Sequence, residues 1–430
     1  MTKLLMTFPV TATSHTLPAY AARGGYATLE RVLRTMRPED VTREVTASGI
    51  QGRGGAAFPA GRKWSVVHLN DHQAHYLCAN ADEGEPGTFK DRWILENAPH
   101  LLIESMLIAA FALQVRHAFV YIRGEFDLPY RRLAAAVAEA TAAGYVNKPL
   151  FDTVFACDII VYRGAGSYVC GEASGLLTSI EGKRGYPRNR PPRLTVRGLY
   201  QRPTVVNNVE TLANLVGIVA NGAEAFRKVG TAKNPGTRLI SISGHITRPG
   251  VYEVEIGYPW AKFIDDDCGG VLHGQKLKCV IPGGISTKVL TAADIASLPL
   301  DPAEVEAAGS SMGSGGMIVV AEGTCMVRLL QVMLRFYHHE SCGQCTPCRE
   351  GMGWLHRIID RIVAGQGRPE DLDRMIQISR FNDGTTICGM GDAAGYATIG
   401  ILAKYRHEFD YWIEHGRSQF DGRLECPKSS

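Results

Sequence analysis

The chain has 430 residues, of which 45% are hydrophobic and 21% are charged, and its formal net charge is +3. This length is too great for one ordinary core, so domains of roughly 100 to 200 residues predict two to four of them. The composition is typical of a soluble globular protein, and the small net charge gives no global argument for a nucleic-acid-binding protein. Eleven cysteines, three of them within "CGQCTPC", indicate metal chemistry in a reducing compartment, so we expect a cytoplasmic location.

The first 60 residues predict an amphipathic helix in "YATLERVLRTM", followed by the glycine-rich loop "GRGGAAFPAG". The N-terminus has one lysine, a short apolar run and no clear small-residue cleavage site, which argues against a secretion signal. Gly52, Gly54 and Ala57 have the G-x-G-x-x-A spacing, but no buried strand precedes them, so a dinucleotide fingerprint is weakly supported. A plain flexible loop is the alternative. Glycines here would let backbone amides approach an anion, with Arg53 and Lys63 nearby.

Residues 61–230 alternate between apolar runs and glycine-rich turns, which predicts an open α/β sheet with ligand loops at the strand ends. The expected strands are "AHYLCAN", "HAFVYIRG" and "DIIVYRG", with helices near 101–115 and 129–143. The first of these helices is too short to span a bilayer and is expected to be buried. Ligand loops are expected at "NADEGEPGT", "RGAGSYVCGEASG" and "VVNNVET".

The acids of "NADEGEPGT", namely Asp82, Glu83 and Glu85, have more than one interpretation. Clustered acids usually form a solvated loop, but after an apolar run they can end a buried strand and hydrogen-bond a polar ring. Calcium is a third reading, although the spacing is not that of an EF-hand. The sequence leaves these alternatives open.

The sequence pattern changes in the second half of the chain. Residues 231–322 carry "TRLISISGHITRPGVYEVEIG" and "LKCVIPGG", which predict a small β-rich domain. Residues 323–430 are helical in pattern. Gly309–Gly313 matches G-x-S-x-G, but no strand precedes it, which argues against a hydrolase nucleophile elbow.

The cysteine motif lies in this helical part. Cys342, Cys345 and Cys348 follow Cys-x-x-Cys-x-x-Cys spacing, and Cys388 in "TTICGMGDAAG" is the natural fourth ligand. Three close thiolates and one distant thiolate are typical of a [4Fe-4S] site. Zinc is the alternative, although zinc sites more often use two separated Cys-x-x-Cys pairs. The other cysteines are expected to be core residues.

Together, "GRGGAAFPAGRKWS", "CNADEGEPGTFKDR", "GAGSYVCGE", "VVNNVETLAN" and "ESCGQCTPCREG…TICG" resemble the flavoprotein (NuoF-type) subunit of respiratory complex I over about residues 24–409. The resemblance implies an α/β fold with a Rossmann-like FMN and NAD(P)H domain at 61–230, preceded by a 1–60 segment with the flavin loop. It further implies a ubiquitin-like β-grasp (SLBB) domain at 231–322 and a helical bundle with one [4Fe-4S] cluster at 323–430. The implied reaction is hydride transfer from NADH to FMN, followed by one-electron steps to the cluster.

The resemblance also assigns residues. The implied FMN-binding residues are Gly52, Arg53, Gly54, Gly55, Lys63, Asn80, Asp82, Glu83, Tyr168, Gly171, Glu172, Asn207 and Asn208. The implied NAD(P)H-binding residues are Phe58, Lys63, Glu85, Ala173, Arg190 and Arg193. The implied cluster ligands are Cys342, Cys345, Cys348 and Cys388. Phe58 would stack on the adenine and Glu85 would lie at the nicotinamide, with no acid or base required for the hydride step.

The nucleotide site departs from the family pattern at four positions, one of which is Val66, where many members have an aromatic residue. Ala173 stands where the family usually has an acid at the adenosine ribose, and Arg193 stands where it usually has an aromatic residue. Arg190 replaces a common lysine and keeps the charge. An acid at the ribose 2′-OH selects NAD, whereas arginine accommodates a 2′-phosphate. We therefore expect NADPH to be tolerated unusually well, the alternative being drift in a site that still uses NADH.

The resemblance further implies a thioredoxin-like [2Fe-2S] partner (NuoE-like) and a large multi-cluster partner (NuoG-like), on the cytoplasmic face of the inner membrane. Contact with the membrane arm would be indirect, and no nucleic acid is expected. The diaphorase subunit of a soluble hydrogenase, formate dehydrogenase or electron-bifurcating complex is the alternative. Many such relatives carry an extra iron–sulfur domain not seen here, which favours complex I. A scaffold or RNA-binding protein using the basic "GYPRNRPPR" segment would need better aromatic platforms than Tyr186 and Tyr200.

Overall fold

The structure is a computed structural model that describes residues 2–67 and 73–420. Contacts divide the chain into two compact units. The first unit comprises Met1–Gly84, Phe89–Ile240 and Val251–Gly257. The second unit comprises Glu85–Thr88, Ser241–Gly250 and Tyr258–Ser430. The four segments expected from the sequence, with their boundaries at 60, 230 and 322, stay a prediction.

The first unit contains a four-stranded parallel sheet. Its strands are β1 (Tyr76–Ala81), β2 (His117–Ile122), β3 (Asp158–Arg163) and β4 (Thr204–Asn208), in the order β3-β2-β1-β4. Parallel strands need crossover connections, which explains why apolar runs alternate with helices along the sequence. The strand order reverses between β1 and β4, which makes this a doubly wound sheet with a switch point at those two strands. The predicted α/β class is confirmed.

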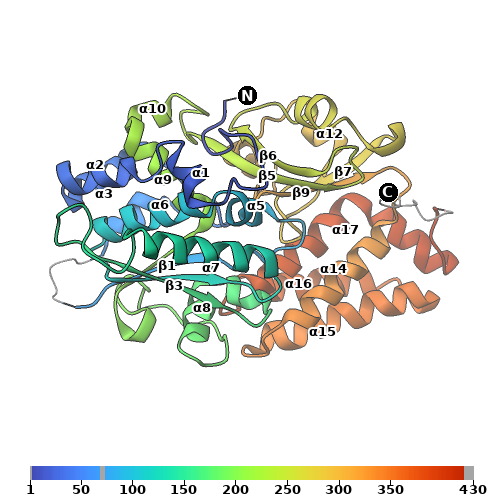
Figure 1. The fold of residues 1–430 in the computed structure, drawn as a ribbon. Coiled ribbons are helices and arrows are strands. Elements are labelled where there is room, and N and C mark those ends of the chain that lie inside the picture. The colour runs from blue at the N-terminus through green and yellow to red at the C-terminus, as the bar shows by residue number, and fades with distance from the viewer. Residues whose placement is uncertain (1, 68–72, 421–430) are drawn as a thin grey trace. The chain divides into compact units, whose positions relative to one another are not determined.

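Helices cover both faces of this sheet (Figure 1), with α6 and α7 on one face and α8 on the other. The helices of the unit are α1 (Leu17–Ala21), α2 (Ala27–Thr35), α3 (Pro38–Ser48), α4 (Ala60–Ser65), α5 (Lys90–Asn97), α6 (Pro99–Ala112), α7 (Asp127–Ala142), α8 (Ala173–Ile180), α9 (Val209–Asn221) and α10 (Ala223–Arg227), with 3₁₀ turns at Tyr168–Gly171 and Leu199–Gln201. Helix α6 begins with Pro99 in its first turn and is buried on nearly every side. This explains why its sequence is apolar throughout rather than on one stripe.

Glu104 is a buried acid on α6 that ties the N-terminal segment to the sheet domain. Its carboxylate accepts hydrogen bonds from the Tyr20 hydroxyl at 2.5 Å, the Tyr26 amide at 2.8 Å and the Leu29 amide at 3.0 Å. Burial raises the pKa of Glu104, and these three donors oppose that shift. The amphipathic helix α2 is thereby held where Leu29, Val32 and Leu33 are buried.

A second, five-stranded sheet has the order β6-β5-β9-β7-β8. Its strands are β5 (Thr237–Gly244), β6 (Gly250–Glu255), β7 (Leu277–Ile281), β8 (Leu290–Thr291) and β9 (Gly316–Ala321). Strands β5 and β9 are parallel, whereas β7 is antiparallel to both β8 and β9. Short helices accompany it at α11 (Trp260–Lys262), α12 (Ala292–Ile295) and α13 (Pro302–Ala307). The β-rich texture expected after residue 231 is confirmed, and the SLBB assignment stays a prediction.

Four helices of the second unit pack side by side as a bundle (Figure 1). They are α14 (Met326–Glu340), α15 (Thr346–Arg361), α16 (Asp371–Asn382) and α17 (Met390–His415). Buried residues of α14, such as Val327, Leu330 and Leu334, recur every three to four positions, as an amphipathic helix requires. A buried ion pair between Lys278 of β7 and Glu408 of α17 ties this bundle to the strand beside it.

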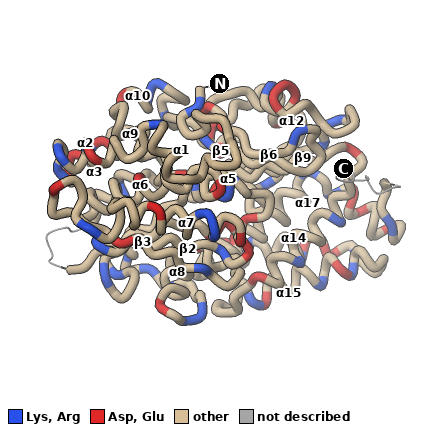
Figure 2. Tube along the Cα trace, viewed as in Figure 1, with Lys and Arg blue, Asp and Glu red and all other residues tan. Residues whose placement is uncertain are grey.

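Basic and acidic residues are both scattered over the described part of the trace, as Figure 2 shows in blue and red. This is typical of a surface without a single-sign field. Among the described residues, no single helix is both long and apolar enough to cross a membrane. Helices α5 and α6, bent by 98° at their junction, reach the required length and hydropathy only as a pair.

Candidate functional site

Two neighbouring strands of the parallel sheet carry polar residues to the switch point. In the register of β1 and β4, Ala79 pairs with Asn207 and Asn80 pairs with Asn208. Parallel strands end at the same edge of the sheet, so Asp82, directly after β1, lies at this edge as well. The carboxyl ends of strands at a switch point are where doubly wound sheets bind ligands. The structure therefore brings both predicted strand-end loops to the expected binding edge.

The loop around the 3₁₀ turn at Tyr168–Gly171 approaches the same edge closely. The Asn80 side-chain amide donates a hydrogen bond of 2.9 Å to the Gly171 carbonyl. A Cβ atom on Gly171 would lie 3.3 Å from the Asp82 carbonyl oxygen, and one on Gly84 would lie 3.3 Å from the Tyr168 ring. A side chain at either position would therefore require a shift of its neighbour. Glycine lets the loops approach each other closely, against backbone at Gly171 and against the Tyr168 ring at Gly84.

The glycine-rich loop lies against the end of β4. It is closed by hydrogen bonds from the Gly52 amide to the Phe58 carbonyl at 2.9 Å and from the Ala60 amide to the Ile50 carbonyl at 3.0 Å. A Cβ atom on Gly54 would lie 3.1 Å from the Cβ of Asn208, so the loop packs directly on a strand-end residue. Helix α3 precedes the glycine-rich loop, and no strand does, as the sequence indicated. Its closure and packing favour an ordered cradle over a plain flexible loop.

Lys63 supplies a positive charge beside this edge. It lies on α4, and its ammonium donates a hydrogen bond of 2.9 Å to the Val206 carbonyl of β4. Its neighbour Trp64 donates from Nε1 to the side-chain oxygen of Asn207 at 3.0 Å. Burial, with a smaller contribution from Arg190, lowers the pKa of Lys63 to about 8. An anion bound here would stabilise the charged form of Lys63.

The side chain of Arg53 has a different environment from the one that the sequence suggested. It is 1% exposed, and its Nη2 donates to the carbonyls of Pro235 at 3.3 Å and Thr237 at 3.0 Å. Its Nε lies 4.0 Å from Oε1 of Glu210. The guanidinium thus belongs to a set of buried charges, while the backbone of Arg53 belongs to the glycine-rich loop.

These buried charges were not anticipated from the sequence. We call Arg53, Glu83, Lys90, Asp91, Glu210 and Arg238 the buried charged cluster; each is less than 9% exposed. Lys90 Nζ lies 2.8 Å from Oδ1 of Asp91 and 2.7 Å from Oε2 of Glu210. A signal did exist: Lys90 and Asp91 begin helix α5 just after a ligand loop, and Glu210 follows the two strand-end asparagines.

Glu172, implied for FMN, and Arg190, implied for the dinucleotide, already contact each other. The Glu172 carboxylate caps α8 by accepting from the amides of Ser174 at 2.8 Å and Gly175 at 3.0 Å, and it pairs with Arg190 at 2.7 Å. Ala173 is the first residue of α8. Arg193 is exposed and forms no ion pair with the described residues. Arg193 is therefore a cation available to a ligand, and Phe58, 45% exposed, is a ring available for stacking.

Glu85 belongs to the second unit, with the rest of the Glu85–Thr88 turn. Its Oε1 accepts a hydrogen bond of 2.8 Å from the Ser286 amide, and its side chain contacts Gly284. Thr88 is similarly held, since its hydroxyl lies 2.5 Å from that of Ser314. The role of Glu85 at a nicotinamide stays a prediction.

The cysteine motif lies at the start of two bundle helices. Cys345 is the N-cap of α15, Cys348 lies in its first turn, and Cys388 stands just before α17. The Cys348 sulfur is 3.4 Å from the Ser341 hydroxyl. Burial raises the pKa of Cys348 to about 11, with smaller contributions from Cys345 and Cys342, so cluster binding would release a proton.

The described residues contain no group of three or more His, Cys, Asp or Glu side chains that could hold a single metal ion. A cubane has a different requirement, because each thiolate binds a different iron atom and the sulfurs stand farther apart than ligands of one ion. Three thiols within seven positions and a fourth at a neighbouring helix start suit such a cluster.

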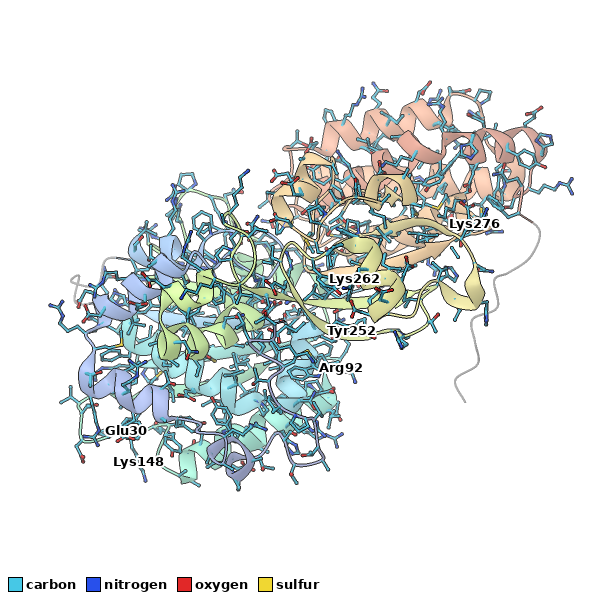
Figure 3. All side chains as sticks on the ribbon, turned by 90° about the horizontal axis from the view of Figure 1, so that it is seen from above. Glu30, Arg92, Lys148, Tyr252, Lys262 and Lys276 are labelled. Carbon is cyan, nitrogen blue, oxygen red and sulfur yellow. The ribbon has the colours of Figure 1, made fainter. Side chains whose placement is uncertain are left out.

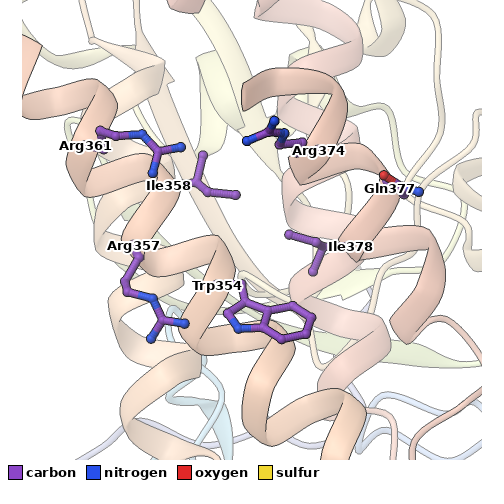
Figure 4. Close-up of a pocket in the computed structure, with 7 residues that line it drawn as sticks. All are labelled: Trp354, Arg357, Ile358, Arg361, Arg374, Gln377 and Ile378. Carbon is purple, nitrogen blue, oxygen red and sulfur yellow. The ribbon is translucent and has the colours of Figure 1, made fainter. Parts of the chain in front are cut away.

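A separate hollow of about 460 Å³ lies between α15 and α16 (Figure 4). It is lined by Trp354, Arg357, Ile358, Arg361, Arg374, Gln377 and Ile378. Arg361 is paired with Asp371, and Arg374 lies 3.6 Å from Glu370. None of the predicted site residues lines this hollow.

A doubly wound sheet with polar strand ends and the Lys63 ammonium at its switch point, in one chain with a four-cysteine bundle, defines a nucleotide-type cofactor protein that also carries an iron–sulfur cluster. Residues 45–217 match the family model of the Nuo51 FMN-binding domain, and residues 328–411 match that of the NADH-ubiquinone oxidoreductase-F iron-sulfur binding region. The chain belongs to the NuoF family of NADH-quinone oxidoreductase flavoproteins.

Individual relatives agree with this assignment. A NuoF-type NADH-quinone oxidoreductase protein of Rhizobium meliloti is 43% identical over 94% of this chain and 96% of its own length. Its counterpart in Mycobacterium tuberculosis is 46% identical over 93% of this chain and 90% of its own. Among solved structures, an NAD⁺-reducing [NiFe]-hydrogenase matches with a TM-score of 0.82 and 33% identity, over 94% of this chain and 67% of that one.

FMN and one [4Fe-4S] cluster are the cofactors of this family, and the residues present fit both. Lys63 would hold the FMN phosphate, next to the backbone amides of the glycine-rich loop. Asn80 and Asn208 lie at the paired ends of β1 and β4, and their contact with FMN stays a prediction. The family assignment decides the cysteine motif in favour of iron–sulfur over zinc.

The depressed pKa of Lys63 predicts that FMN binding weakens in alkali. A cation is lost as the pH rises through about 8, and with it a charge-assisted hydrogen bond to phosphate. We expect the affinity of the FMN-free protein for FMN to fall about tenfold between about pH 7 and pH 9.5. Fluorescence titration across this range measures the effect. Lys63→Met should bind FMN weakly at every pH, and its affinity should depend little on pH. An unchanged pH dependence of the affinity in Lys63→Met would contradict the assignment of Lys63 to the FMN phosphate.

Proposed function

We propose that this chain is the electron-input flavoprotein of an NADH-quinone oxidoreductase. It oxidises NADH and passes the electrons singly through its [4Fe-4S] cluster to partner subunits and on towards quinone. The observation that carries the proposal is the combination, in one chain, of polar strand ends paired at Asn80 and Asn208 with the four-cysteine motif of the helical bundle.

FMN supplies the chemistry, since it accepts a hydride from NADH and can release electrons one at a time. The protein binds FMN and the dinucleotide and orients them relative to each other. Lys63 neutralises phosphate, Asn80 and Asn208 fix polar atoms of the flavin, and Phe58 stacks on the adenine. Glu85 is assigned to the nicotinamide. None of these side chains has to move a proton in the hydride step, because position and stacking are sufficient.

Purification with cofactor analysis tests this function directly. The protein expressed with intact iron–sulfur assembly should contain about one FMN and about four irons per chain. It should also reduce ferricyanide with NADH, because a small oxidant can take electrons from the flavin without a partner subunit. A colourless protein without flavin or NADH oxidation would overturn the proposal.

The proposed partners are a thioredoxin-like [2Fe-2S] subunit and a large multi-cluster iron–sulfur subunit. The proposed location is the peripheral arm, on the cytoplasmic face of the inner membrane. A second candidate is the diaphorase subunit of a soluble complex, which the likeness to the NAD⁺-reducing [NiFe]-hydrogenase supports. Affinity purification from the native cell separates the two: co-purifying quinone reductase activity supports the first, and hydrogen-dependent NAD⁺ reduction supports the second.

The nucleotide loop leads to a proposal on specificity. Glu172 already caps α8 and pairs with Arg190, Ala173 has no carboxylate, and Arg193 is an exposed cation. A 2′-phosphate would therefore meet an arginine and no opposing acid at position 173. We propose that NADPH is used alongside NADH.

The predicted test is the ratio of kcat/KM for NADPH to that for NADH in the ferricyanide assay. Ala173→Glu should lower this ratio about tenfold, and Arg193→Phe about threefold to tenfold, because each change alters one charge near the 2′ position. Arg197→Ala, an exposed arginine beyond the proline pair, is the control. A strong preference for NADH that Arg193→Phe leaves unchanged would contradict the proposal that NADPH is also used.

A further inference from the structure

We propose that Asp91 and Lys90, which no cofactor role has included so far, are positioning residues of the FMN site. Asp91 fixes residues of two different ligand loops, and Lys90 makes it possible for Asp91 to be charged there. This inference rests on the proposed function, because it concerns the flavin that the switch point binds.

Asp91 connects the loop after β1 with the end of β4. Its backbone amide donates 2.8 Å to Oε1 of Glu83, and the next amide, that of Arg92, donates 3.0 Å to Oε2. Its side-chain Oδ2 accepts a hydrogen bond of 2.5 Å from the Asn208 amide nitrogen. One residue therefore orients Glu83 through its backbone and Asn208 through its carboxylate.

These bonds leave capacity for a ligand. The Asn208 amide nitrogen has two N–H groups, of which Asp91 takes one. The Asn208 oxygen faces away, since it accepts from the amides of Glu210 at 3.0 Å and Thr211 at 3.3 Å as the N-cap of α9. The second N–H is thus the donor that Asn208 can offer, and its direction is set by Asp91.

Lys90 neutralises the carboxylates on which this geometry depends. Its side chain is 1% exposed, and its ammonium lies 2.8 Å from Asp91 and 2.7 Å from Glu210. Two buried carboxylates without a cation between them would repel each other and one would take up a proton. Burial raises the pKa of Asp91, and Lys90 is the largest influence in the opposite direction. A protonated Asp91 would be a poorer acceptor for Asn208.

The same cluster reaches the glycine-rich loop. Glu210 is held by the Leu239 amide at 2.8 Å and lies 4.0 Å from the Arg53 guanidinium. The Arg53 amide in turn donates 2.8 Å to the hydroxyl of Thr211, the residue that Asn208 caps. Three flavin loops, those of residues 52–55, 82–84 and 207–208, are therefore joined through one set of buried charges.

Asp91→Asn is the sharpest test because it preserves size and removes one acceptor. The new amide would place N–H either against the N–H of Asn208 or against the Lys90 ammonium and the Glu210 amide, so one side of this arrangement is lost in either orientation. We expect the dissociation constant for FMN, measured by flavin fluorescence on the full-length protein, to rise at least tenfold. Lys90→Met should have the same effect. The electron paramagnetic resonance signal of the reduced [4Fe-4S] cluster should be unchanged in both.

Lys278→Met is the matched control, because Lys278 is also a buried ammonium paired with a buried carboxylate, Glu408, in the second unit. It should lower the thermal midpoint as Lys90→Met does, and keep the wild-type affinity for FMN. A change of twofold or less in Asp91→Asn, or an equal loss of FMN in Lys278→Met, would overturn the proposal. Failure of the wild-type protein to bind FMN would instead overturn the proposed function.

Discussion

Replacing Cys345 with alanine is expected to remove the [4Fe-4S] cluster and to stop electron transfer beyond the flavin. The remaining three thiolates leave one iron of the cubane without a protein ligand. Iron content should fall from about four per chain to less than about one, and the cluster signal in electron paramagnetic resonance should disappear. Reduction of ferricyanide by NADH should stay within about twofold of the wild type, since the flavin supplies those electrons.

Cys325→Ala is the control for this experiment. Cys325 is a free cysteine at the N-cap of α14, outside the motif, and iron should be retained when it is changed. Retention of a full complement of iron in Cys345→Ala would contradict the ligand assignment. Loss of ferricyanide reduction together with the iron would show that the two cofactor sites are not independent.

Replacing Glu104 with alanine should give the largest loss of stability. It leaves the Tyr20 hydroxyl and the amides of Tyr26 and Leu29 without their acceptor in a buried environment, and it opens a cavity beside α6. We expect about 3 kcal/mol or more of destabilisation, from unsatisfied donors and lost packing. For a unit of this size that corresponds to a fall of roughly 6 to 12 °C in Tm. Calorimetry of the purified protein measures it.

Glu30→Ala is the comparison for Glu104→Ala. Glu30, labelled in Figure 3, lies on α2 and pairs with Arg34 at 3.0 Å, with both side chains more than 40% exposed. Exposed ion pairs on helices contribute only about 0.3 to 0.5 kcal/mol, so Tm should change by about 1 °C. Equal falls in the two variants would show that the Glu104 network is not what anchors the N-terminal segment.

Three of the four strands of the parallel sheet could be predicted because their apolar runs are bounded by glycine and polar turns. The fourth, β4 (Thr204–Asn208), lies partly in "VVNNVET", which was expected to be a ligand loop. "AHYLCAN" became β1 (Tyr76–Ala81) and "DIIVYRG" became β3 (Asp158–Arg163). Polar residues at the ends of parallel strands lie at the same edge of the sheet, and Asn80 and Asn208 are paired at the carboxyl ends of β1 and β4. Helix α16 (Asp371–Asn382) was not singled out, because "DLDRMIQISRFN" mixes charges with few large apolar residues.

Side-chain directions at the site could not be predicted in the same way. The guanidinium of Arg53 turns to carbonyls of Pro235 and Thr237, more than 180 positions away. Lys90 and Glu210 look like surface charges when the sequence is read locally, since charged residues are rarely buried unless paired. The sequence shows that both residues lie close to ligand-loop segments, but their pairing depends on how these distant segments meet, which no periodicity or spacing encodes.

The turn Glu85–Thr88 shows how the two units share the chain. The polypeptide passes from one unit to the other at residues 84, 88, 240, 250 and 257, so neither unit is a continuous piece. A fragment ending at residue 240 would lack Glu253, whose carboxylate binds the amides of Leu4, Leu5 and Met6. One crossover point in the gene therefore cannot move the whole first unit into another protein. The first unit and the cysteine motif of the second unit are expected to be inherited together, because the chain passes repeatedly between the two units.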